Sequence, residues 1–148
     1  MSDIDFKPYV ELEKIEVGME ASYSQTITDC DVKCFAGISG DHNPVHVCED
    51  YANKSRYKKR IAHGLISASF FSALFGTKLP GPGCVYVSQS LKFKKPVYLN
   101  DTVTATVIVE NIDIEKRRIF FKTICKVKNT IVIHGEAEIY VPEVRKKL

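Results

Sequence analysis

The chain has 148 residues, of which 45% are hydrophobic and 26% charged, and its net charge is +3. These values fit a globular domain with a real core and exclude a wholly disordered chain. A charge of this size is too small to indicate nucleic-acid binding. We therefore expect a single domain over residues 1–148 that has no nucleic-acid partner.

The beginning of the chain carries acidic residues and no apolar core, so it does not look like a secretory signal, and Pro8 predicts an irregular lead-in. The most apolar stretch, Ile61–Leu79, is interrupted by polar side chains and predicts a buried helix rather than a membrane span. The five cysteines include no CxxC pair, which is typical of reduced thiols. We expect a cytoplasmic protein without membrane contact.

The first predicted elements are a strand over Glu20–Ile27 and a helix that follows it at once. Thr28 or Asp29 suits the N-cap of this helix, and apolar residues then recur at helical spacing. Gly37 and Gly40 end the helix within Ser39–Asp41.

Pro44 determines the expected backbone of the next segment. It lacks an N–H and disfavours helical backbone at the residue before it, so Asp41–His46 is predicted to be extended or turning. We expect a short helix over Glu49–Asn53 and a basic loop over Lys54–Arg60.

The second half of the chain predicts one long helix followed by strands. His63–Leu79 is apolar nearly all round, which is typical of a buried helix, and Pro80–Gly83 ends it. Residues of period two follow in four runs, Val85–Val87, Val103–Val109, Ile119–Val127 and Ile131–Val141. The predicted fold class is therefore α+β, with an antiparallel sheet curled around a long central helix.

Chemistry concentrates in the segment Gly40–His46, where a carboxylate and an imidazole lie five residues apart. Asp41 and His46 on bent backbone can share a water molecule and divide acid and base work. Alternatively, Asp41 only caps a turn and His46 is an ordinary surface or core histidine. The residues alone leave both interpretations open.

The sequence Phe35–His46, with Ala52 six residues further on, resembles the signature of the MaoC-like (R)-specific enoyl-CoA hydratases. The resemblance continues, in order, through Ile61–Leu65, Leu79–Gly81, Gln89–Phe93, Pro96–Tyr98 and Asp101–Val103. It implies a hot-dog fold, a homodimer or a higher multiple of dimers, and a pocket at or near the dimer interface. It also implies that Asp41 and His46 are the catalytic dyad and that the reaction adds water to a trans-2-enoyl-CoA, giving an (R)-3-hydroxyacyl-CoA.

That chemistry assigns further roles in the sequence. We expect Asp41 to act as base with His46 as its partner, and the Gly64 N–H, at the start of the central helix, to stabilise the developing oxyanion. Asn43 is expected to order the loop, and His63 to cap the central helix. The predicted substrate contacts are Asn43, together with Ser72 and Phe75 for the acyl chain, and Lys92, Lys94, Lys95 or the Arg56–Arg60 loop for the CoA phosphates.

No paired metal-ligand motif and no phosphate-binding Gly-rich loop occurs, so neither metal nor cofactor is expected, and CoA is part of the substrate. Three other functions remain as alternatives. The basic groups, which include Arg145–Lys147, also suit an acyl carrier protein, as in a 3-hydroxyacyl-carrier dehydratase. A hot-dog thioesterase is disfavoured because Ile61–Leu79 contains no Asp or Glu. A non-catalytic acyl-CoA-binding subunit is disfavoured by the Asp41/His46 pair.

Overall fold

The computed structural model describes residues 10–143, so the lead-in around Pro8 and the basic group Arg145–Lys147 lie outside the described residues. The helices in this range are η1 (Leu12–Lys14), α1 (Asp29–Ser39), α2 (Pro44–Val47), α3 (Glu49–Lys54) and α4 (Gly64–Thr77). The strands are β1 (Glu20–Thr26), β2 (Val85–Gln89), β3 (Lys92–Phe93), β4 (Thr102–Asp113), β5 (Arg118–Val127) and β6 (Thr130–Tyr140).

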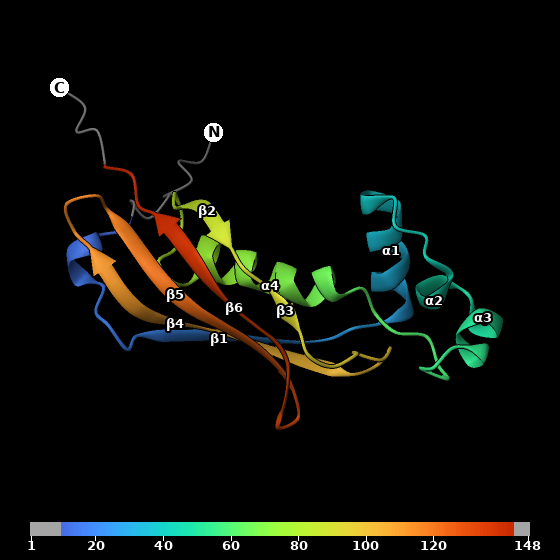
Figure 1. The fold of residues 1–148 in the computed structure, drawn as a ribbon. Coiled ribbons are helices and arrows are strands. Elements are labelled where there is room, and N and C mark those ends of the chain that lie inside the picture. The colour runs from blue at the N-terminus through green and yellow to red at the C-terminus, as the bar shows by residue number, and fades with distance from the viewer. Residues whose placement is uncertain (1–9, 144–148) are drawn as a thin grey trace, which may run out of the picture.

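The strands form one antiparallel sheet in the order β1-β4-β5-β6-β2, and β3 pairs with β6 beside that path. Register shifts interrupt the pairings β2/β6, β4/β5 and β5/β6. An extra residue on one strand increases the local twist, so these shifts help to curl the sheet (Figure 1). The four runs of period two fall on β2, β4, β5 and β6, which confirms the predicted antiparallel sheet.

Helix α4 lies along one face of this sheet and contacts β1, β4, β5 and β6 (Figure 1). Its side chains Phe71, Leu74 and Phe75 are fully buried against the sheet, and the Phe75 ring packs on Phe121 of β5 with centroids 4.7 Å apart. Burying a Phe or Leu side chain stabilises a fold by about 2 kcal/mol, so this interface is a major part of the core. The predicted sheet around a central helix is confirmed.

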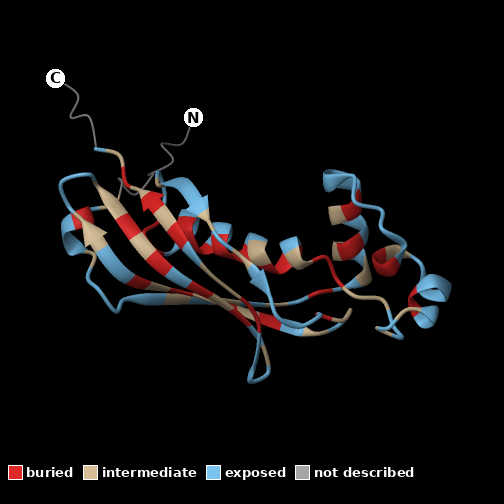
Figure 2. Ribbon diagram, viewed as in Figure 1, coloured by how far each residue is buried: buried red, intermediate tan, exposed pale blue. Residues whose placement is uncertain are grey.

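The opposite side of α4 is open, contrary to the prediction of a helix buried all round (Figure 2). Leu65 is 54% exposed, and Ser69, Ser72 and Ala73 are exposed as well. The prediction was wrong because it counted small side chains as apolar, and because no element within residues 10–143 covers this side. None of the helices in the same range has both the length and the apolarity needed to cross a lipid bilayer.

Helices α1, α2 and α3 lie together at one end of the molecule, beyond the N-terminus of α4 (Figure 1). Helix α1 begins with a capping box in which Thr28 and Asp31 satisfy each other's backbone N–H groups. It ends at Gly40, whose φ of 77° is left-handed and suits glycine. Both predicted ends of this helix are therefore confirmed.

The backbone after Gly40 differs from the prediction over its second half. Asp41–Asn43 is irregular as predicted, but Pro44–Val47 forms the helical turn α2. Pro44 occupies the first turn of the helix, where an N–H has no partner to lose, and the Asn43 side chain accepts a hydrogen bond from the Val45 N–H at 3.3 Å. Asn43 thus orders the loop as expected, by capping α2.

Two features of the sheet have no counterpart in the predicted pattern. Strand β3 is only two residues long, too short for an alternating pattern to reveal. In β6, Ile131 is 41% exposed whereas Val132 is buried. The register shift opposite Cys125 and Lys126 inserts one residue here and reverses the phase of the alternation.

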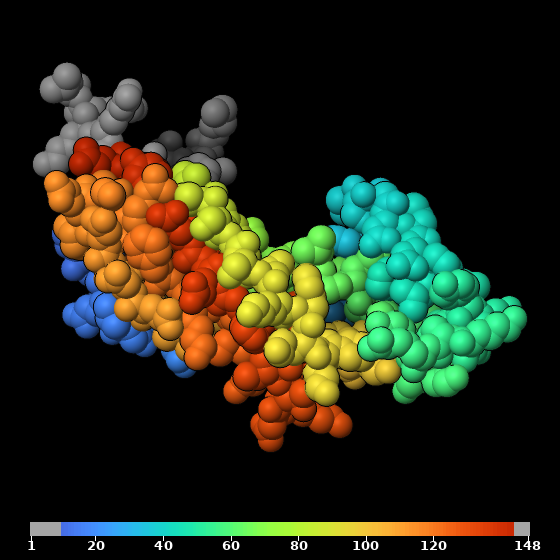
Figure 3. Space-filling view, viewed as in Figure 1, coloured from blue at the N-terminus to red at the C-terminus, as the bar shows by residue number. Residues whose placement is uncertain are grey.

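The link between β2 and β3 crosses very close to β6, where the yellow and red segments meet on the surface (Figure 3). The Ser90 N–H donates to the Glu136 carbonyl at 2.8 Å, and the Glu136 N–H donates to the Ser90 hydroxyl at 3.0 Å. A Cβ atom on Gly135 would lie 1.8 Å from the Ser90 carbonyl oxygen. Since that atom belongs to the backbone, only glycine fits at this position.

We therefore expect Gly135→Ala to lower the free energy of unfolding by about 2–3 kcal/mol, measured by urea denaturation. Gly37→Ala is the matched control, because Gly37 lies in α1 and a Cβ there meets nothing within 4 Å. The control should stabilise the protein by up to about 1 kcal/mol. A Gly135→Ala protein as stable as the parent would show that the backbones do not approach this closely.

Candidate active site

Asp41, His46 and Gly64 meet at one small pocket of about 150 Å³, where the α1–α3 segment joins the start of α4. One ligating atom from each of Asp41, His46 and His63 lies within 4.8 Å of the other two. The remaining lining residues are Phe35, His63, Leu65 and Phe93. The structure therefore brings together the three residues to which the sequence assigned catalytic roles.

The hydrogen bonds of His46 determine which of its ring nitrogens is free. Its side chain is 9% exposed, and Nδ1 lies 2.7 Å from the main-chain oxygen of Ile61. A carbonyl oxygen only accepts hydrogen bonds, so Nδ1 carries the hydrogen. In the neutral ring, Nε2 then has a free lone pair and can accept a proton.

Burial is the main influence on the charge of His46. Removal from water lowers the pKa of this imidazole below 6.5. The hydrogen bond to Ile61 acts in the opposite direction, while the neighbouring His63 lowers the pKa further. His46 is therefore a neutral imidazole at pH 7.

Asp41 is held by its immediate neighbours and keeps part of its carboxylate free. Its N–H donates to the Ser39 hydroxyl at 3.0 Å, and its Oδ1 accepts from the Asn43 N–H at 3.1 Å. The side chain is 48% exposed, so Asp41 is reached by solvent more easily than His46. This arrangement suits a carboxylate that orients a water molecule.

Arg60 was predicted to belong to a basic loop that could meet the CoA phosphates, but its side chain is largely buried and bonded on both sides. The Nε–H donates to the main-chain oxygen of His46 at 2.6 Å, and Nη1 lies 2.7 Å from Oδ1 of Asp29. Lys33 and Arg60 beside Asp29 lower the pKa of that carboxyl. Arg60 thus ties α2 to α1, and no local sequence signal separates it from the exposed lysines around it.

A second hollow of about 240 Å³ shares His46, Gly64 and Phe93 with the first. Its remaining lining includes three basic side chains, those of Arg56, Lys94 and Lys95. A positive rim beside the dyad suits the phosphates of a large anionic substrate. Lys94 and Lys95 thus line a hollow with His46, and their contact with the CoA phosphates stays a prediction.

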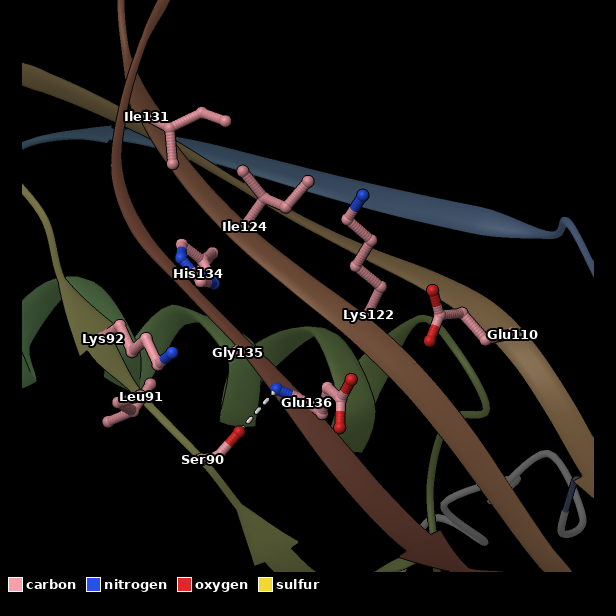
Figure 4. A pocket seen from close by; sticks show the side chains of 10 residues that line it. All are labelled: Ser90, Leu91, Lys92, Glu110, Lys122, Ile124, Ile131, His134, Gly135 and Glu136. Atoms are coloured by element: carbon pink, nitrogen blue, oxygen red, sulfur yellow. Dashed lines mark hydrogen bonds between the residues drawn. The ribbon is translucent and has the colours of Figure 1, made fainter.

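Lys92 lies elsewhere, in a hollow of about 690 Å³ on the outside of the sheet (Figure 4). This hollow is lined by residues from β4, β5 and β6 together with Ser90, Leu91 and Lys92. It contains neither Asp41 nor His46, and its acids, Glu110 and Glu136, share the lining with Lys92 and Lys122. We therefore place the active site at the smaller pocket, where the acid–base pair lies.

The two residues predicted to contact the acyl chain are not at the dyad in the single chain. Ser72 is exposed on the open side of α4 and follows Gly64 by eight residues, about 12 Å along the axis. Phe75 is 1% exposed and packs against Tyr86 and Phe121 in the core. Neither residue lines the two hollows beside His46.

Asp41, His46 and His63 are also residue types that bind transition metals. However, Nε2 of His63, which lies 4.0 Å from Oδ2 of Asp41, donates its hydrogen to the main-chain oxygen of Asp41 and has no lone pair for a metal. The arrangement fits acid–base work better, and the absence of a metal stays a prediction.

Comparisons with known proteins agree with this geometry. Residues 11–135 match the family described as "MaoC like domain". An (R)-specific enoyl-CoA hydratase of Rhodospirillum rubrum is 54% identical over 130 residues, 88% of this chain and 90% of that protein. A 3-hydroxybutyryl-CoA dehydratase of Methylorubrum extorquens is 43% identical over 88% of this chain and 83% of its own length.

Among solved structures, an (R)-hydratase from A. caviae involved in PHA biosynthesis aligns with a TM-score of 0.86 at 36% identity. The alignment covers 88% of this chain and 99% of that one. The chain therefore belongs to the MaoC-like domain family and has the hot-dog fold.

The pKa of His46 can be tested by an NMR titration of its ring nitrogens, with His46→Gln used to assign the signal. We expect a midpoint below pH 6.5 and a hydrogen on Nδ1 in the neutral form. Because the folded pKa is below the unfolded value, protonation favours unfolding. The stability contribution of His46 is therefore complete above pH 6.5 and decreases as the pH falls through the folded pKa. A midpoint above 6.5 contradicts this description of the pocket.

Proposed function

We propose that the protein is an (R)-specific enoyl-CoA hydratase, which adds water to a trans-2-enoyl-CoA and gives an (R)-3-hydroxyacyl-CoA. One observation carries this proposal. A neutral His46 with a free Nε2 lies beside the Asp41 carboxylate and the first N–H of α4. The named relatives of the MaoC-like family support the same reaction.

The geometry supports a division of work between the two residues. Asp41 holds the water by accepting a hydrogen bond, and Nε2 of His46 takes one of its protons as the oxygen attacks the β-carbon. Nε2–H then delivers that proton to the α-carbon on the same face, so one water is added in the syn sense. The sequence favoured Asp41 as the base, whereas the free lone pair of buried His46 favours the histidine.

Attack at the β-carbon moves negative charge to the thioester oxygen. The N–H of Gly64, the first residue of α4, has no acceptor within its own helix and lies at the positive end of the helix dipole. We therefore assign it to that oxygen, where an oriented donor stabilises the transition state. In the free protein the Phe93 ring lies over Gly64, so a Cβ atom there would be 2.5 Å from the ring.

Asp41→Asn and His46→Gln should each lower kcat for crotonyl-CoA at least about 100-fold, because each removes one half of the acid–base pair. The measurement is the loss of enoyl absorbance, with chiral analysis of the product. His42→Gln is the matched control, since His42 is an exposed histidine of the same segment that lines neither hollow. Parent-like rates in either dyad variant would refute the assignment.

The basic rim next to the dyad supports a phosphate-bearing substrate and leaves two carriers to compare. Coenzyme A and the prosthetic group of an acyl carrier protein both bring phosphate to this rim. We favour CoA because the relatives from Rhodospirillum rubrum and Methylorubrum extorquens are both named for CoA thioesters. Matched rates on crotonyl-CoA and on crotonyl-acyl carrier protein distinguish the two.

Lys94→Gln combined with Lys95→Gln should raise KM for crotonyl-CoA about tenfold and leave kcat nearly unchanged, because the phosphates that these lysines bind take no part in the reaction. KM for the phosphate-free crotonyl N-acetylcysteamine thioester should not change. Lys92→Gln is the control, because that lysine faces the outer hollow. An equal effect on both substrates would show that the two lysines do not bind phosphate.

We also propose that the protein forms a homodimer or a multiple of dimers. Strand β2 is the last in the sheet order and, among the described strands, pairs with β6 only, and its apolar side chains Val85, Tyr86 and Val87 are exposed. An unpaired apolar edge is a suitable surface for a second copy. The cytoplasmic location remains a prediction, supported by free thiols at the cysteines in the structure.

A further inference from the structure

His63 is placed to control the catalytic pair without being part of it. It is the residue before α4 and was expected to cap that helix, yet its side chain makes no capping bond. It is instead 3% exposed and directed toward the segment that carries Asp41. One polar atom of this buried imidazole, Nε2, therefore serves a contact distant in sequence, while Nδ1 has no hydrogen-bond partner among residues 10–143.

That contact is a hydrogen bond to the main chain of Asp41. The Nε2 atom of His63 lies 2.9 Å from the Asp41 carbonyl oxygen, 22 residues away. The acceptor is a carbonyl, so Nε2 carries the hydrogen and donates it. Nε2 is 4.0 Å from the Asp41 carboxylate oxygen Oδ2, which is too long for a hydrogen bond.

The ring of His63 also fills the space between two elements. Its centroid is 3.9 Å from that of His46 and 4.8 Å from that of Phe35 in α1. The planes of the two histidine rings differ by 31°, so the rings are roughly stacked. His63 is thus in contact with both residues of the proposed dyad at once.

The bond from His63 is decisive because Gly40–Asn43 is otherwise held only locally. Within residues 10–143, the other hydrogen bonds of this segment join residues at most four positions apart, such as Ser39 to Asp41 and Asp41 to Asn43. These local bonds set the shape of the turn but not its distance from the rest of the fold. The bond from His63 fixes that distance.

We propose that His63 is a positioning residue, which holds the Asp41 carboxylate at working distance from His46 through the Asp41 carbonyl and the stacked rings. This inference rests on the proposed hydratase function for its kinetic consequences. The restraint on Gly40–Asn43 does not depend on that function. His63 exchanges no proton with the substrate or the water.

Two variants separate the hydrogen bond from the ring. His63→Phe keeps a flat ring for stacking and lacks the donor, while His63→Gln keeps an N–H that can reach the position of Nε2. We expect His63→Phe to lower kcat for crotonyl-CoA by about 10- to 100-fold with KM within about threefold, since a small displacement of a catalytic group is that costly. We expect His63→Gln to retain kcat within about threefold of the parent.

His134→Phe is the matched control, because His134 faces the outer hollow and should tolerate the same change with parent kinetics. Equal loss in the Phe and Gln variants, both folded by thermal melting, would overturn the proposal and indicate direct proton transfer by the imidazole. Parent rates in both, or a change in KM alone, would overturn it as well. If His63→Phe does not fold, His63→Met, which also lacks a donor, replaces it.

Hydrogen exchange measured by mass spectrometry tests the restraint without using activity. The amides of Gly40–Asn43 should exchange about tenfold faster in His63→Phe than in the parent, and at the parent rate in His63→Gln. Unchanged exchange in His63→Phe would overturn the positioning role. If the parent protein hydrated no enoyl-CoA, the proposed function would be refuted, but the hydrogen-exchange rates would still test whether His63 restrains Gly40–Asn43.

Discussion

The hydrogen bond from His46 Nδ1 to the Ile61 carbonyl is the interaction on which the site depends. It fixes the ring and leaves Nε2 as the free nitrogen. The residues around Ile61 complete the restraint, because Arg60 binds the His46 carbonyl, His63 binds the Asp41 carbonyl, and Gly64 begins α4. One segment of five residues, Arg60–Gly64, thus orients the acid, the base and the proposed oxyanion donor together.

The connection between β3 and β4 determines where that segment lies. The Ala62 N–H donates to the Val97 carbonyl at 2.7 Å, and Ile61 forms an isolated bridge with Tyr98. On its other side the segment continues into α4, whose buried face is fixed by the core. The α1–α3 segment makes few contacts of its own with the sheet, so its position relative to α4 depends on these main-chain bonds and on the Arg60–Asp29 pair.

The sequence predicted features that are encoded locally. Alternating side chains revealed the long strands, and Thr28 and Gly40 marked the ends of α1. The spacing of Asp41 and His46 on a proline-bent segment indicated their pairing, which the pocket geometry matches. The roles of Arg60 and His63 were missed because each binds a main-chain carbonyl 14 or 22 residues away. Any residue supplies such an acceptor, so no residue type in the sequence marks it.

Asp41 of the proposed dyad is exposed to solvent in the single chain, and this exposure bears on both the reaction and the assembly of the protein. Fixed dipoles act most strongly where water is excluded, yet Asp41 is 48% exposed, and the apolar side chains of Ile38, Leu65 and Phe93 are uncovered near it. The pocket of about 150 Å³ is also smaller than the 300–1,000 Å³ or so that ligand sites usually occupy. An acyl chain longer than a few carbons therefore extends beyond this pocket, and the open side of α4, where Ser72 lies, is an exposed surface that it can follow. A cover on that side of α4 would exclude water from the site and limit the length of the chain, so the proposed homodimer bears on specificity as well as on assembly.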